Sequence, residues 1–237
     1  MSIFLVGGAT TPEVDAELWP AFVAEASAYA ARSERTVPRI AVVIVDEGDG
    51  EAALDTIARQ LGGDCEVRPV LVPIGHDVQQ ADLAMIDALY IAGGLTPAYR
   101  QAVHPVQGEI RRLVAGGLPY LGYSAGAQIA AEQAIVGGWR IGGVPVAPSD
   151  AAEDLDEVTI EQGIGLVDIS VDVHAAQWGT VGRLIAAVEA GMVPGGVAID
   201  ESTALVVGDG DLRVLGTGSV WQVVPSESGV NVSTAGA

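Results

Sequence analysis

Hydrophobic and polar positions along the chain follow two patterns that take turns. Short, continuous apolar runs, each typical of a strand buried on both faces, occupy residues 3–6, 39–46, 67–74, 88–92, 118–123 and 169–173. Between them, apolar residues recur at helical spacing over residues 13–31, 51–61, 96–115, 125–133 and 177–190. Strands that alternate with helices predict a mostly parallel sheet flanked by helices on both faces, which is a three-layer α/β fold.

Prolines refine the interpretation of two of these segments. Pro69 and Pro73 cannot donate a backbone hydrogen bond, so the strand that contains them is expected at an edge of the sheet or as a short element. Pro105 predicts a break in the helical pattern of residues 96–115, because proline interrupts the hydrogen bonds of a helix interior.

The last part of the chain has a different pattern. Short β-like runs separated by glycine turns lie at residues 197–201, 203–208, 212–216 and 220–224. They predict a C-terminal antiparallel β extension on the parallel core. We therefore expect residues 1–225 to form a single α/β domain. Residues 226–237 are small and polar, and we expect them to be a flexible C-terminal tail.

Composition excludes several classes of function. The formal net charge is −20 and there is no lysine, so the surface should repel nucleic acid and anionic membranes. The sequence has no run of about 18 apolar residues, so we expect no membrane span. The start, MSIFLVGG, lacks the basic region and cleavage pattern of a signal peptide, and we expect a cytoplasmic protein.

Cofactor and metal chemistry find no support in the sequence. The single cysteine, Cys65, cannot form a disulfide within the chain or a paired-cysteine zinc site, and His76, His104 and His174 are scattered. Glycine-rich dinucleotide and phosphate motifs are absent. We therefore expect no metal and no cofactor.

The segment Gly122-Tyr123-Ser124-Ala125-Gly126 carries the strongest chemical signal. It lies between a predicted strand and a predicted helix, the context in which a G-x-S-x-G turn presents a nucleophilic serine. Glycines on both sides let neighbouring backbone pass close to the turn. The Ala125 N–H would then stand at the start of a helix, where it can stabilise an oxyanion. The alternative is a structural turn with a small residue at position 124.

A nucleophilic serine needs a base and an acid that orients the base. His174 ends an apolar alternating run and is the best candidate for the base, although a lone histidine there is often structural. Asp172, Asp200 and Glu201 are candidates for the acid, and spacing alone does not choose among them. Gly94, at the end of a predicted strand, can present a backbone N–H to a ligand or serve as a plain turn.

Four segments, taken together and in order, resemble one family of serine peptidases. They are IAGGLT (91–96), GYSAGAQ (122–128), VDVHAAQWGTVGRL (171–184) and VAIDESTALVV (197–207). The family contains α-aspartyl dipeptidase and cyanophycinase, and the resemblance covers roughly residues 3–207. It implies a fold like that of class I glutamine amidotransferases, with a flavodoxin-like three-layer arrangement.

The resemblance also implies roles for individual residues. Ser124 matches the family's nucleophile and His174 its base. Glu201 is the acid that the family pattern favours, with Asp172 and Asp200 as possible supporting carboxylates. The resemblance implies a serine-type peptidase that hydrolyses dipeptides or short peptides through an acyl-enzyme. An amidotransferase-like or general acyl hydrolase acting on a non-peptide substrate, or a catalytically idle ligand-binding relative, stays open.

Other positions map to the oxyanion hole and the substrate pocket. Gly94 and Ala125 match the two N–H donors of the oxyanion hole. Leu95, Trp178 and Arg183 match pocket positions, and two of them depart from the family pattern. Leu95 stands where a polar residue is usual, and Trp178 replaces the first arginine of an arginine-rich run. The expected partner is a small peptide substrate, and a homodimer is a further expectation.

Overall fold

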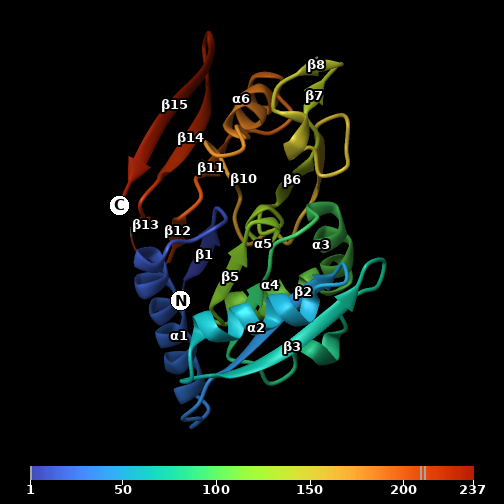
Figure 1. The fold of residues 1–237 in the computed structure, drawn as a ribbon. Helices are drawn as coiled ribbons and strands as arrows, with labels where there is room; N and C mark the ends of the chain where they lie inside the picture. The colour runs from blue at the N-terminus through green and yellow to red at the C-terminus, as the bar shows by residue number, and fades with distance from the viewer. Residues whose placement is uncertain (1, 209, 211) are drawn as a thin grey trace.

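The central layer of the protein is a mixed sheet with the strand order β13-β12-β1-β5-β4-β2-β3 (Figure 1). The computed structural model describes residues 2–208, 210 and 212–237, and residues 1, 209 and 211 lie outside the described part. The parallel strands are β1 (Ile3–Val6), β2 (Arg39–Asp46), β3 (Glu66–Pro73), β4 (Ala88–Ile91) and β5 (Tyr120–Tyr123). The mostly parallel sheet predicted from the sequence is confirmed, with the proline-containing β3 at its edge.

Helices cover both faces of this sheet. One face carries α1 (Pro12–Ala31) and α2 (Gly50–Leu61), and the other carries α3 (Thr96–Val103), α4 (Gln107–Ala115) and α5 (Ala125–Gln128). The expected break at Pro105 is confirmed as a short 3₁₀ turn between α3 and α4. Both helix layers therefore follow from the alternation of strand and helix patterns.

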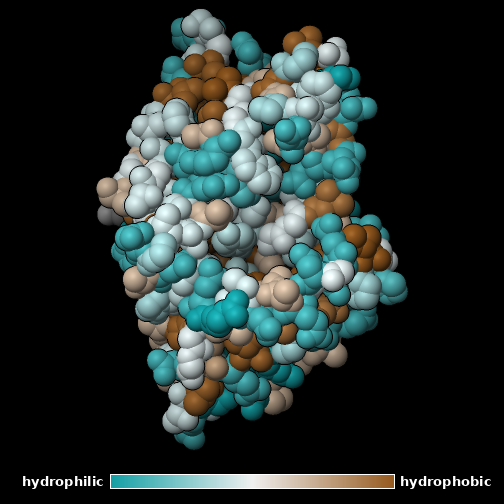
Figure 2. All heavy atoms as spheres, in the orientation of Figure 1, coloured by the Kyte–Doolittle hydropathy of each residue, from teal (hydrophilic) through white to brown (hydrophobic). Residues whose placement is uncertain are grey.

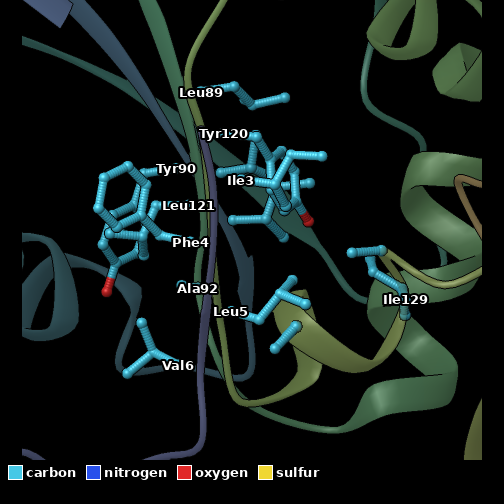
Figure 3. Packing of buried hydrophobic residues seen from close by; sticks show 14 of the residues in the cluster. Ile3, Phe4, Leu5, Val6, Leu89, Tyr90, Ala92, Tyr120, Leu121 and Ile129 are labelled. Atoms are coloured by element: carbon cyan, nitrogen blue, oxygen red, sulfur yellow. The ribbon is translucent and has the colours of Figure 1, made fainter. Parts of the chain in front are cut away.

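Side chains of β1 illustrate how the core is divided between the two faces. Phe4 and Val6 point to one side of the sheet with Tyr90, and Ile3 and Leu5 point to the other (Figure 3). On the first side, the Phe4 ring meets a ring of α1 edge to face, with 5.6 Å between centroids. Successive residues of a strand alternate between faces, so a continuous apolar run is needed where both faces are covered.

The helix expected over residues 125–133 is shorter than its pattern suggests. It ends at Gln128, and the chain then enters β6 (Gln133–Gly137). The reason is tertiary pairing: the Ile129 carbonyl accepts the Ile164 N–H at 2.7 Å, and the Glu132 N–H donates to the Val167 carbonyl at 2.9 Å. These bonds to a distant segment replace the hydrogen bonds that would have continued the helix.

The C-terminal strands extend the core in two ways. β12 (Thr203–Val207) and β13 (Arg213–Gly216) continue the central sheet in antiparallel pairing beyond β1. A second sheet has the order β10-β11-β14-β15, with β10 (Ser170–Val173) and β11 (Gly196–Ile199) parallel to each other. Near it lies α6 (Val181–Glu189), whose start is four residues later than the predicted 177.

The expectation of a flexible tail over residues 226–237 is wrong. Residues Gly229–Gly236 form β15, which pairs antiparallel with the whole length of β14 (Ser219–Ser226). Val230 packs against a cluster of buried apolar side chains that includes Leu184 and Val188 of α6. The small polar residues of this segment did not predict a strand, because an exposed edge strand needs few apolar side chains.

The remaining small strands and the molecular surface complete the picture. β7 (Arg140–Ile141) pairs with β8 (Val144–Pro145), and β9 (Thr159–Gln162) pairs with β6. Hydrophilic residues cover much of the face seen in Figure 2. Within residues 2–208, 210 and 212–237, no helix combines the length and apolar character needed to cross a membrane.

The strand β1 is expected to be a major source of stability. Leu5 is fully buried between the β12 and β5 neighbours of its strand. We predict that Leu5→Ala lowers the free energy of unfolding by about 2–5 kcal/mol, because it leaves a cavity in a packed layer. Urea unfolding measures this change. The control is Val37→Ala at a half-exposed position, which should change stability by less than about 0.5 kcal/mol.

Candidate active site

Ser124 lies on the sharp turn between β5 and α5. Its backbone has φ 51° and ψ −109°, a conformation that residues other than glycine rarely adopt. The turn requires the two flanking glycines: a Cβ on Gly122 would stand 2.3 Å from the Gly126 carbonyl oxygen, and one on Gly126 would stand 2.2 Å from the Ile91 carbonyl oxygen. The strained turn expected for a nucleophile is therefore present, and it places the Ser124 side chain at the carboxyl end of the sheet.

A chain of hydrogen bonds joins Ser124 to His174 and Glu201. Ser124 Oγ lies 2.9 Å from His174 Nε2, and His174 Nδ1 lies 2.8 Å from Glu201 Oε1. Because a carboxylate only accepts, Nδ1 carries the proton and Nε2 is the free acceptor for the serine hydroxyl. Of the three carboxylates left open by the sequence, Glu201 is the one that reaches the histidine.

The end of β1 holds the serine and the histidine in place through its backbone. The Ser124 N–H donates to the Val6 carbonyl at 2.9 Å, and the His174 N–H donates to the Gly7 carbonyl at 2.8 Å. Ser124 follows a strand of the central sheet, whereas His174 follows β10 of the second sheet. The carbonyl of the last residue of β1 and that of the residue after it therefore set the distance between two residues that lie 50 positions apart.

The environment of His174 favours its neutral form. Burial of the side chain lowers the pKa of His174 below its usual value of 6.5, and the hydrogen bond and negative charge of Glu201 oppose this shift. The net direction is downward. An imidazole that is neutral near pH 7 can accept a proton from a serine hydroxyl, which is the requirement for a general base.

Asp172 and Asp200 support the site from other directions and do not contact His174. Asp200 accepts hydrogen bonds from the Ala176 N–H at 3.0 Å, the Ser219 N–H at 2.9 Å and the Trp221 indole N–H at 3.0 Å. It thereby ties the segment after His174 to β14. Asp172 is fully buried and is bound by an arginine.

Arg183 is that arginine, and its expected place in the substrate pocket is wrong. It is 2% exposed and donates to both oxygens of Asp172, at 2.8 and 2.7 Å. Its remaining nitrogen donates to the Gly138 and Ala151 carbonyls, at 3.1 and 2.7 Å. Asp172, two residues before the histidine, therefore takes two of the guanidinium's hydrogen bonds and backbone carbonyls take the others, so the guanidinium is held inside the protein.

Gly94 and Ala125 both lie beside the serine. Ala125 is the first residue of α5, so its N–H has no acceptor within the helix. The turn that contains Gly94 approaches the serine closely, since a Cβ on Gly93 would stand 2.9 Å from Ser124 Cβ. The neighbouring Leu95 N–H is directed to Glu47 Oε1 at 3.3 Å. Gly94 and Ala125 therefore both lie close to Ser124, as the predicted oxyanion hole requires.

A cavity of about 570 Å³ opens over the serine. Its lining consists of Glu47, Gly94, Leu95, Ser124, Ser149, Asp150, Ala152, Glu153, Asp154 and Trp178. Leu95 and Trp178, which the sequence assigns to a substrate pocket, are among them. The size suits a small substrate, since pockets of roughly 300–1,000 Å³ hold small molecules.

Several acidic residues of this lining were not predicted as site residues. Glu47 directly follows β2, and Glu153 belongs to the loop that covers the cavity. Glu153 accepts the Thr96 N–H at 2.9 Å, and burial raises the pKa of its carboxyl above the usual value. The position of Glu47 at the carboxyl end of a parallel strand is a signal that sequence reasoning could have used.

Trp178 contacts the base directly. Its indole stacks on the His174 imidazole, with 3.9 Å between ring centroids and an angle of 8° between the planes. The side chain is 44% exposed and borders the cavity over Ser124.

In the part of the chain that the structure describes, no group of three or more His, Cys, Asp and Glu side chains is arranged to hold a metal ion.

A serine, a buried neutral histidine and a carboxylate in hydrogen-bond contact at a strand end form the arrangement found in serine hydrolases. A family description agrees with this class: the model of peptidase family S51 matches residues 51–215. The chain therefore belongs to peptidase family S51.

The chain is similar to several cyanophycinases. It is 40% identical to the cyanophycinase of Trichormus variabilis over 126 residues, which are 52% of this chain and 39% of the relative. It is 34% identical to the cyanophycinase of Synechococcus elongatus over 171 residues, which are 68% of this chain and 50% of the relative. The matches thus span half or less of the length of these curated relatives.

The Arg183–Asp172 pair should act on stability because it is buried away from the cavity. We predict that Arg183→Met lowers the free energy of unfolding by about 3–5 kcal/mol, since it leaves the Asp172 carboxylate buried without a charge partner. Adding Asp172→Asn should recover much of this loss, and chemical unfolding measures both variants. As a control, Arg112→Ala removes an exposed ion pair with Glu109 and should have little effect. Wild-type stability of Arg183→Met would contradict the assignment.

Proposed function

We propose that this chain is a serine peptidase that hydrolyses dipeptides or short peptides through an acyl-enzyme. The observation that carries the proposal is the continuous hydrogen-bond chain from Ser124 Oγ through the His174 ring to Glu201 at the floor of a cavity. Membership of peptidase family S51 supports the same reaction class.

In the first half of the reaction, Ser124 Oγ attacks the carbonyl carbon of the scissile amide while His174 Nε2 takes the hydroxyl proton. Glu201 keeps the proton on Nδ1 and stabilises the imidazolium that forms. The tetrahedral intermediate then collapses, the C–N bond breaks, and His174 gives its new proton to the leaving amine. The acyl group remains as an ester on Ser124.

In the second half, water attacks the ester carbonyl and passes a proton to His174 Nε2. Collapse of this second intermediate breaks the bond to Ser124 Oγ, which regains its proton from the imidazolium. In both halves the negative oxygen is bound by the N–H groups of Gly94 and Ala125. Each such donor typically contributes about 3 kcal/mol to lowering the barrier, because it is oriented before the charge develops.

The charge of the cavity favours substrates with a positive group. Its lining carries the carboxylates of Glu47, Asp150, Glu153 and Asp154, and no lysine or arginine belongs to the lining residues that the structure describes. A free amino terminus or a basic side chain of a substrate would gain Coulomb energy there, whereas an acidic group of a substrate would be repelled. We therefore propose short peptides with a positive group close to the scissile bond as the preferred substrates.

A peptide panel tests the proposal. The panel contains dipeptides and tripeptides with basic, neutral or acidic residues, together with cyanophycin because of the names of the relatives. We predict release of amino acids from basic peptides in preference to acidic ones. Ser124→Ala should reduce the rate by at least roughly four orders of magnitude, and Glu201→Gln by roughly 10²- to 10⁴-fold.

The outcomes of this panel separate the competing readings. Hydrolysis of simple esters or amides without any peptide cleavage would place the chain among general acyl hydrolases. If Ser124→Ala kept the peptidase rate of the parent protein, the nucleophile would be wrongly assigned. Ser202→Ala is a suitable control, since that hydroxyl donates to the Ala9 carbonyl and contacts neither Ser124 nor His174.

The pH dependence of kcat/KM should report the lowered pKa of His174. The base works only when it is neutral, so activity should persist below pH 6.5 and fall as the pH drops through the lowered pKa. Glu201 raises the pKa of His174, so in Glu201→Gln this pKa should be lower still. The acid limb of the residual activity should therefore move to a lower pH. An acid limb above pH 6.5 in the parent protein would contradict the lowering of the His174 pKa by burial.

A further inference from the structure

The two hydrogen bonds of His174 leave its ring incompletely restrained. They fix the edge positions of Nδ1 and Nε2 through Glu201 and Ser124. Hydrogen bonds tolerate a broad range of angles, and the χ2 torsion of histidine has no sharp rotamers. Packing against the ring must therefore supply the remaining restraint on its orientation.

Trp178 supplies one of these packing contacts. The local chain path explains why the indole meets the imidazole: the Trp178 N–H donates to the His174 carbonyl at 2.8 Å, which closes one turn from position 174 to position 178. Residues four apart in such a turn lie on the same side. The rings stack at 3.9 Å with an 8° angle, so the indole lies flat on the imidazole.

Gly8 supplies the other contact. Its φ of 132° is a backbone conformation that side chains disfavour, and a Cβ built there would stand 2.1 Å from His174 Cε1 and 2.4 Å from Nδ1. No other residue type fits without moving the imidazole. Gly8 follows Gly7, whose carbonyl accepts the His174 N–H, so the same short segment holds the backbone and touches the ring.

We propose that Gly8 and Trp178 form a slot that positions the His174 imidazole for proton transfer with Ser124. Both are positioning residues, because they act on the base and not on the reacting atoms. The inference rests on the proposed role of His174 and goes beyond it: the resemblance places Trp178 in the substrate pocket and assigns no role to Gly8, whereas both residues lie against the His174 ring. Trp178, which stands where the family resemblance implies an arginine, would then support the base of this chain.

Trp178 also borders a second cavity of about 620 Å³, next to the one over Ser124. Its substitution will therefore change the binding of substrates that occupy either cavity. A test of positioning has to separate this effect from the effect on the base. A small fluorophosphonate serves this purpose, because Ser124 Oγ displaces fluoride from phosphorus only when His174 is placed to take the proton.

The first experiment compares two glycine substitutions of matched backbone cost. Gly8→Ala should slow labelling of Ser124 by about 100-fold, as expected when a catalytic group is displaced by about 1 Å. Gly229→Ala is the control: Gly229 has φ 134°, but a Cβ there meets no atom within 4 Å. Its labelling rate should equal that of the parent protein. Circular dichroism and thermal unfolding confirm that both variants fold.

The second experiment compares two replacements of Trp178. Trp178→Ala should slow labelling roughly 3- to 10-fold, the range that corresponds to the loss of one aromatic pair. Trp178→Phe keeps a stacked ring and should stay within about twofold of the parent rate. A KM for peptides that rises in both variants while kcat falls only in Trp178→Ala would further separate positioning from substrate binding.

Nuclear magnetic resonance provides a readout that needs no substrate. The chain has three histidines, so the Hε1 and Hδ2 signals of His174 can be assigned by substitution of His76 and His104. The stacked indole should shift the His174 signals upfield through its ring current. Trp178→Ala should abolish this shift, and Gly8→Ala should move the signals or broaden them.

Two results would overturn the proposal. One is labelling of folded Gly8→Ala and Trp178→Ala at the rate of the parent protein. The other is a His174 spectrum that is the same in Trp178→Ala and in the parent. If the parent protein were labelled but cleaved no peptide, the proposed peptidase function would fail while the slot would stand. If Gly8→Ala does not fold, the Trp178 variants and their spectra still decide the question.

Discussion

Two consecutive carbonyl groups at the end of β1 are the constraint on which the rest of the site depends. The Val6 carbonyl holds the backbone of Ser124, and the Gly7 carbonyl holds the backbone of His174. Ser124 directly follows β5 of the central sheet, and His174 directly follows β10 of the second sheet. A few tenths of an ångström at this junction would change the 2.9 Å contact between serine and histidine, so the core that fixes β1 also fixes the chemistry.

The carboxylates around His174 have separate tasks that follow from their hydrogen-bond partners. Asp172 is saturated by Arg183, and Asp200 by backbone and indole N–H groups. Glu201 has Oε1 directed to the imidazole. A buried carboxylate is stable only when it accepts hydrogen bonds, and charged or well-oriented donors close to it form the strongest ones. Glu201 is thereby left as the carboxylate that orients the base.

The surroundings of His174 and the lining of the cavity have different electrostatic effects. Burial and the stacked indole keep water from the His174 ring, and burial lowers its pKa so that the neutral form prevails near pH 7. The cavity over Ser124 has four carboxylates among its lining residues, and we propose that they favour positive groups on the substrate. The base is therefore buried, whereas the carboxylates line an open cavity in which a positive group would gain Coulomb energy.

The sequence by itself determined the alternation of strands and helices and the sharp turn at Ser124, and it narrowed β3 to an edge strand or a short element, because these depend on local periodicity, proline and glycine. It also made His174 the leading candidate for the base. Only the tertiary structure decided that Glu201 is the carboxylate at the histidine, that Arg183 is buried, that residues 229–236 form a strand, and that Trp178 stacks on the base. Each of these depends on contacts between residues that lie in different elements or on the direction of a side chain, and neither is encoded in the spacing of residues along the chain.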